Sequence, residues 1–139
     1  HCTFVESHAR TAAGIRANLA LLGLPAAAAQ VVAARVEPWL RGARLPRPAA
    51  LVLADPPSAY ARHADLLAAL ADAAAVAGGA LIVLETAQGH ALAPPARLEV
   101  LRTKDYGDTQ VCYLRKSATD PAAEPDPGRR AWRCCCWGR

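Results

Sequence analysis

The stretch LVLADPPSAY, residues 51–60, decides the fold that we predict for this chain. Its first four residues form a short apolar run, which is typical of a buried strand in a parallel sheet and too short to span a membrane. Asp55 and two prolines end the run, because proline cannot donate a ladder hydrogen bond and disfavours helix in the residue before it. We therefore expect Asp55 at the carboxyl end of a strand, the edge where open α/β sheets bind ligands. An ordinary Asp-Pro turn is the alternative.

The flanking sequence predicts alternating strands and helices. Strands are expected at residues 3–6, 30–34, 51–54, 80–85, 98–103 and 109–114, helices at 8–22 and 61–76, and a short helical turn at 37–40. Ser7 is the candidate cap of the first helix and Gly23 its stop, and Gly78-Gly79 is expected just beyond the second. Residues 105–108 join the last two strands as a hairpin. This order predicts an α/β sheet with helices on both faces and an antiparallel C-terminal hairpin.

Composition and charge are those of one globular domain over residues 1–115. A hydrophobic content of 53% and a charged content of 20% fit a soluble protein, and the net charge of +4 permits RNA as a partner without requiring it. Because no signal peptide precedes His1 and no apolar run reaches membrane length, we expect a cytoplasmic protein without membrane contact. Residues 116–139 lack periodicity and are predicted to be a disordered or non-native tail.

Cysteine and histidine spacing does not indicate a metal site. Cys2 and Cys112 look like strand residues, and residues 134–136 are consecutive cysteines, unlike a zinc knuckle or a redox pair. Three histidines are expected to be solvated at helix starts or in loops: His8, His63 and His90. We therefore expect a protein without a bound metal.

Two acids at strand ends form the candidate site. In nucleotide-binding α/β folds an acid in the position of Glu6 accepts hydrogen bonds from ribose hydroxyls, although an exposed acid at a helix start is an alternative. An exocyclic amine on a base is a weak nucleophile, because its lone pair is delocalised into the ring. The carboxylate of Asp55 and a proline carbonyl can accept the amine hydrogens and direct the lone pair at an electrophile. Tyr60 is the aromatic in reach that could stack on the base.

Five segments resemble one protein family in order and spacing. They are FVE at 4–6, IRANL at 15–19, DPP at 55–57, VLE at 83–85 and YGDT at 106–109. Over residues 3–115 the chain resembles the bacterial 16S ribosomal RNA guanine-N2 methyltransferases, which have the Rossmann-like class I fold that uses S-adenosylmethionine. Many amino-methyltransferases share the DPP element, but its combination with the helix containing Asn18 and with the hairpin is more specific.

The resemblance implies roles for particular residues. Glu6, with Ser7 beside it, would bind the ribose of S-adenosylmethionine, and Arg35-Val36 would lie beside the adenine. Asp55-Pro56-Pro57, with Tyr60 close by, would hold the guanine amine once the base has left its stack. The implied partner is 16S ribosomal RNA or the small ribosomal subunit, bound by a monomer.

The chain also departs from the family pattern. That pattern begins with a strand and a glycine-rich cofactor loop, so we expect a sheet without its first, central strand, between the strands that end at Glu6 and Asp55. His8 replaces a usual acid, and Ser58 replaces the aromatic usual after the prolines. We therefore expect an inactive fragment equivalent to the C-terminal two-thirds of such an enzyme. Alternatives are an amino-methyltransferase for DNA adenine or protein glutamine, and a catalytically silent RNA-binding module.

Overall fold

The computed structural model describes residues 1–57 and 59–118. Its elements are β1 Cys2–Glu6, α1 Ala9–Leu21, β2 Ala29–Ala33, α2 Val36–Gly42, β3 Ala49–Ala54, α3 His63–Asp72, β4 Val76–Ala87, β5 Leu98–Tyr106 and β6 Thr109–Lys116. The prediction that a tail begins at residue 116 is wrong for Lys116, which is buried as the last residue of β6. The part of the predicted tail at residues 119–139 lies outside the described residues.

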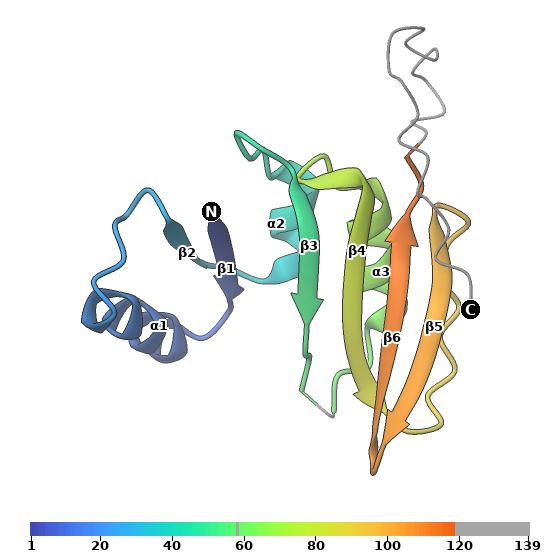
Figure 1. Ribbon diagram of the computed structural model, residues 1–139. Helices are drawn as coiled ribbons and strands as arrows, with labels where there is room; N and C mark the ends of the chain where they lie inside the picture. The colour runs from blue at the N-terminus through green and yellow to red at the C-terminus, as the bar shows by residue number, and fades with distance from the viewer. Residues whose placement is uncertain (58, 119–139) are drawn as a thin grey trace, which may run out of the picture.

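The strands form two sheets (Figure 1). β1 and β2 pair in parallel, from Cys2 opposite Ala29 to Glu6 opposite Ala33. The larger sheet has the order β3-β4-β6-β5, in which β3 is parallel to β4 while β6 is antiparallel to both β4 and β5. The predicted α/β fold, with parallel strands joined through helices and an antiparallel hairpin at the end, is confirmed.

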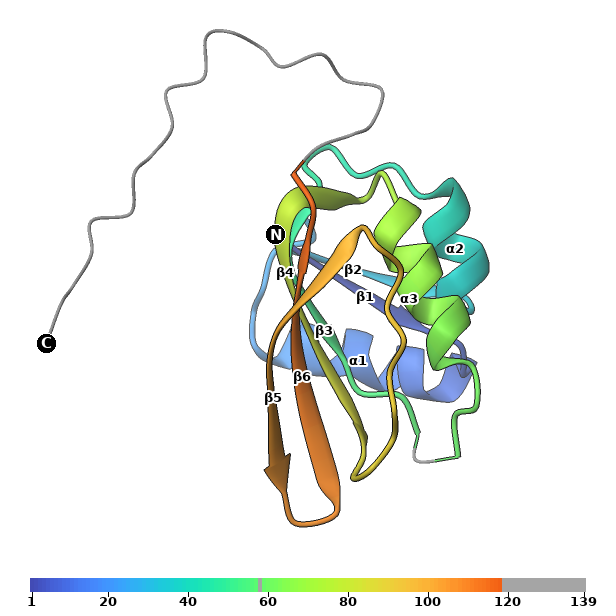
Figure 2. The same ribbon diagram turned by 90° about the vertical axis from the view of Figure 1, so that its right-hand side faces the viewer.

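β1 and β3 do not pair with each other in the part of the chain that the structure describes. The arrowheads of both strands point downward in Figure 1, but the two strands run at an angle to each other in Figure 2. Of the two arrangements open to strands without a central neighbour, closing up against each other or leaving unpaired edges, the structure has the second. The N-terminal β1-α1-β2 segment and the larger sheet are therefore joined through the chain, not through a continuous ladder.

The hydrophobic core lies between the larger sheet and the helices α2 and α3, which cover one of its faces (Figure 2). Its largest fully buried side chains are Leu67, Leu70, Ile82, Leu84 and Leu114. Among the described residues, β1, α1 and β2 contribute nothing to this cluster, and Ala12 is their one buried side chain. On the opposite face of β3, Leu51 and Leu53 are 54% and 74% exposed. Most of the apolar packing thus belongs to residues 40–114.

The ends of α1 agree only in part with the prediction. Ser7 does not cap the helix: the N-cap residue is His8, and no side chain caps that end. The backbone N–H of His8 instead donates to Oε1 of Glu6, at 2.6 Å. The C-terminal stop is confirmed, since Gly23 has φ +66°, the left-handed conformation that glycine adopts without strain.

The second predicted helix is shorter than expected. α3 covers His63–Asp72 in place of residues 61–76. The prediction that Gly78-Gly79 follows a helix end is wrong, because this pair lies within β4, whose first residue pairs with Ala49 of β3. Pairing with a distant strand has overridden the local helical pattern.

The hairpin turn is also tighter than predicted. Tyr106 pairs with Thr109, so the loop consists of Gly107 and Asp108 alone. Gly107 has φ +57°, which suits the two-residue turns that match the twist of the strands.

Candidate active site

Glu6 lies at the carboxyl end of β1, where its side chain is one-quarter exposed. Oε1 accepts the backbone N–H of His8 and, more weakly, the hydroxyl of Ser7 at 3.4 Å. The hydrogen bond from the His8 backbone is the main cause that lowers the pKa of Glu6, so the carboxylate is ionised at neutral pH. Within residues 1–57 and 59–118 nothing donates to Oε2. That oxygen can accept a hydrogen bond from a ligand hydroxyl.

The segment predicted to contact an adenine lies next to Glu6. The backbone N–H of Ala34 donates to the carbonyl oxygen of Glu6 at 3.0 Å, which joins the carboxyl ends of β2 and β1. Arg35 follows as the N-cap residue of α2 and is exposed, while Val36 packs against the core. The structure therefore brings together all the residues predicted to bind the cofactor.

Asp55 follows β3 and is exposed. No described side chain donates to its carboxylate or forms an ion pair with it. Pro56 is half-buried and Pro57 exposed, and the carbonyl of Pro57 accepts the backbone N–H of Tyr60 at 2.8 Å, which closes a turn. The carboxylate thus lies between the end of β3 and this turn, where a substrate can reach it.

Tyr60 is attached to α2. Its hydroxyl donates to Oε1 of Glu37 at 2.7 Å, and its ring meets the ring of His63 edge-on, with the centroids 5.2 Å apart. Burial and, after it, the hydrogen bond to Glu37 raise the pKa of Tyr60 to about 12. The side chain is therefore neutral and fixed at any physiological pH.

Glu37 is the residue that the sequence did not reveal. It lies in the first turn of α2, is only 3% exposed, and has Oε1 3.4 Å from Nη1 of Arg62. Burial by itself raises the pKa of Glu37, but the hydrogen bond from Tyr60 and the charges of Arg62 and Arg35 outweigh it, so the pKa lies below its ordinary value. The apolar neighbours of Glu37 in VEPWL indicate that this acid is buried. Its partner Tyr60 is 23 residues away in the sequence, so the local pattern could not predict the pair.

The expectation of solvated histidines is wrong for His63. This residue begins α3 and is 7% exposed, and the centroid of its ring lies 4.4 Å from that of His90, in the loop after β4. Burial and, to a lesser degree, His90 lower the pKa of His63, and its Nδ1 has no hydrogen-bond partner among the described residues. His8 and His90 are exposed, as predicted.

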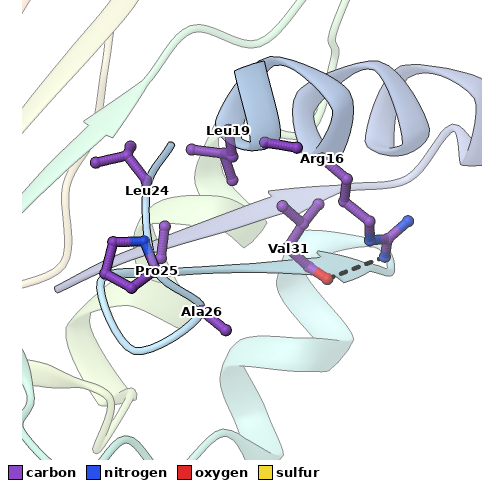
Figure 3. A pocket seen from close by; sticks show the side chains of 8 residues that line it. Arg16, Leu19, Leu24, Pro25, Ala26 and Val31 are labelled. Carbon is purple, nitrogen blue, oxygen red and sulfur yellow. Dashed lines mark hydrogen bonds between the residues drawn. The ribbon is translucent and has the colours of Figure 1, made fainter. Parts of the chain in front are cut away.

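Two shallow hollows of the surface lie away from Glu6 and Asp55, and one of them borders His90. A shallow hollow of about 300 Å³ between α1 and β2 is bordered by Leu19, Leu24 and Pro25, and the guanidinium of Arg16 donates across it to the carbonyl of Val31 at 3.0 Å (Figure 3). Neither Glu6 nor Asp55 borders it.

The described residues carry no group of three or more side chains suited to hold a metal ion. In the same part of the chain no helix is both long and apolar enough to cross a membrane.

Comparison with protein families gives one match over most of the chain. Residues 1–115 match the family model described as "Conserved hypothetical protein 95". No curated protein matches the sequence.

Solved structures share the fold. "Putative methyltransferase yhhF" from Escherichia coli is 25% identical, with a TM-score of 0.71 over 84% of this chain and 64% of that one. A "putative methylase" from Haemophilus influenzae is 22% identical, with a TM-score of 0.72 over 83% of this chain and 71% of that one. A "conserved hypothetical protein" from Streptococcus pyogenes is 22% identical, with a TM-score of 0.70 over 83% of this chain and 71% of that one. The chain thus spans just under two thirds of the length of the Escherichia coli protein.

Proposed function

Because the chain belongs to the family described as Conserved hypothetical protein 95, a methyltransferase family, we propose that it is part of an enzyme that methylates the exocyclic N2 amine of a guanine in 16S ribosomal RNA. The observation that carries the proposal is the position of two acids: an ionised Glu6 ends β1 and an exposed Asp55 follows β3, each at the carboxyl edge of its own sheet. In open α/β sheets this edge binds ligands.

S-adenosylmethionine is the methyl donor that we propose, and the residues beside β1 fit its nucleoside. Glu6 has a carboxylate oxygen without a protein partner within the described residues, which suits a ribose hydroxyl, and Ser7 adds a second polar group. Arg35-Val36 lies next to Glu6 through the hydrogen bond of Ala34 and can border an adenine. When bound, the cofactor would supply a methyl group attached to a positively charged sulfur, which is a strong electrophile.

Asp55-Pro56-Pro57 would act on the guanine amine. The Asp55 carboxylate is free to accept one amine hydrogen, and a proline carbonyl of the motif can accept the other, which turns the nitrogen lone pair toward the electrophile. As the nitrogen gained its bond to the methyl carbon, the methyl–sulfur bond would break and leave a neutral thioether. The nearby carboxylate would stabilise the positive charge on the nitrogen until that nitrogen lost a proton to water. The base must first leave its stack, as it does in other enzymes that modify bases.

The test is single-turnover methylation of 16S ribosomal RNA beside a calorimetric titration with S-adenosylmethionine. It uses the protein that the whole open reading frame encodes. We expect Asp55→Asn to slow methyl transfer by about a hundredfold to a thousandfold, which corresponds to roughly 3–4 kcal/mol of barrier, and to leave cofactor affinity unchanged. Glu6→Ala should weaken cofactor binding first. Glu99→Gln, which removes an exposed acid of β5, is the matched control.

Each component of the proposal can fail separately. Methylation at the parent rate by Asp55→Asn would mean that this acid merely ends a strand. Methylation of DNA adenine or of a protein glutamine, with none on ribosomal RNA, would change the substrate. Binding of RNA by a protein that does not bind the cofactor would identify a catalytically silent module.

A further inference from the structure

The loop between β3 and α3 carries the proposed amine-binding motif, and it needs support from outside itself. Asp55 and Pro57 are exposed, and within the loop the hydrogen bond from the Tyr60 N–H to the Pro57 carbonyl closes one turn. A turn of this kind keeps Pro57 and Tyr60 together but does not orient them relative to the sheet. The orientation must come from contacts between the loop and another element.

The support comes from α2, through Glu37. Its carboxylate binds the loop at two points, accepting the Tyr60 hydroxyl at 2.7 Å and lying 3.4 Å from Nη1 of Arg62. Arg62 is also the N-cap residue of α3, and its Nε donates to Asp65 at 2.9 Å in the first turn of that helix. Glu37 therefore connects α2, the loop and the start of α3 through one buried side chain.

Burying a carboxylate costs free energy, because the charged group loses its hydration. At 3% exposure Glu37 loses nearly all of its hydration, and an apolar side chain at this position would pack without that cost. A carboxylate fixes the position of the group that donates to it, since a hydrogen bond to a carboxylate is short and directional. The observed 2.7 Å between the Tyr60 hydroxyl and Oε1 is of this kind.

We propose that Glu37 is a positioning residue, which holds Asp55-Pro56-Pro57 at the carboxyl edge of the sheet by bonding Tyr60. The inference rests on the proposed function for its catalytic consequence and on the contacts of Glu37 for its structural one. Tyr60 then acts through the hydrogen bond of its hydroxyl to Glu37, and not by stacking its ring on the base.

Tyr60→Phe separates these two roles, because it keeps the ring and removes the hydroxyl. In the protein from the whole reading frame, we expect Tyr60→Phe and Glu37→Gln each to lower the single-turnover rate about tenfold. The double variant should be no slower than the slower single one, because both act on one contact. Affinity for S-adenosylmethionine should not change. Ile82→Val is the matched control: it weakens the core without removing a contact of Glu37 and should keep the parent rate.

Hydrogen exchange gives a second measurement that needs no activity. The amide of Tyr60 should exchange at least tenfold faster in Tyr60→Phe and Glu37→Gln, and at the parent rate in Ile82→Val. A parent rate of methylation in Tyr60→Phe, or unchanged exchange at the Tyr60 amide, would overturn the inference. If the parent protein itself neither binds cofactor nor methylates RNA, the proposed function fails, and the exchange measurement alone decides whether Glu37 holds the loop.

Discussion

Leu67→Ala should destabilise the larger sheet with α2 and α3, and leave the stability of the β1-α1-β2 segment unchanged. Leu67 is fully buried in α3 and belongs to the cluster between the helices and the larger sheet. Removing its side chain from a packed core costs roughly 2–5 kcal/mol, as lost transfer free energy plus the cavity left behind. Because about 1.4 kcal/mol is a tenfold change in an equilibrium constant, amides that exchange only when this core unfolds should exchange roughly 30-fold to several thousandfold faster.

The β1-α1-β2 segment should not respond in the same way. None of its described residues belongs to the core cluster, and its two strands pair only with each other. We therefore expect β1 and β2 to open locally, at a free energy below that of global unfolding. Their amides should exchange faster than those of β4 in the parent and should be unchanged by Leu67→Ala.

Native-state hydrogen exchange followed by mass spectrometry or NMR measures both effects in one sample. Ile15→Ala is the reciprocal control, because Ile15 is a half-buried residue of α1. It should accelerate exchange in β1 and β2 and leave β4 unchanged. If Leu67→Ala accelerates β1 and β4 by the same factor, the chain unfolds as one cooperative unit, and the inference from the separate sheets is refuted.

Two further changes test buried polar contacts. Lys116→Met should lower the free energy of unfolding by roughly 1–3 kcal/mol in urea titrations. The reason is that Nζ of Lys116 donates to the buried carbonyls of Ala73, at 2.7 Å, and Val76, at 3.0 Å. An unchanged urea midpoint would contradict the prediction. Tyr60 has a folded pKa of about 12, above its unfolded value of about 10, so its contribution to stability should be complete below pH 10 and lost as the pH rises to 12. Tyr60→Phe should remove this loss, which is roughly 2–3 kcal/mol. An equal loss in both proteins would show that other groups cause it.

Local physical chemistry was enough to predict much of this fold. The apolar run before Asp55 had to be short and extended, because two prolines follow it. Gly23 had to stop α1, because glycine takes the left-handed conformation at little cost. These decisions involve neighbours in the sequence, so the strand-helix order and the two acids at strand ends, Glu6 and Asp55, could be predicted without a structure.

The ends of elements that depend on distant pairing could not be predicted. Residues 73–76 continue a pattern that is locally compatible with helix, but Val76 lies opposite Ala49 in the sheet, and pairing there ends α3 at Asp72. The carbonyl groups released at that end accept hydrogen bonds from Lys116, which arrives from the last strand. Such contacts join residues more than twenty positions apart, and no local preference encodes them.

The site divides in the same way. The sequence by itself determined that Glu6 and Asp55 follow strands, because apolar periodicity and proline act on the residues next to them. Only the tertiary structure decided that Glu37 is buried, that Tyr60 points its hydroxyl at this acid, and that His63 lies under His90. A charged side chain is normally exposed, and its burial is stable only when partners meet it in space. Those partners come from α2, from the loop after β3 and from the start of α3, so their meeting depends on how the helices pack on the sheet.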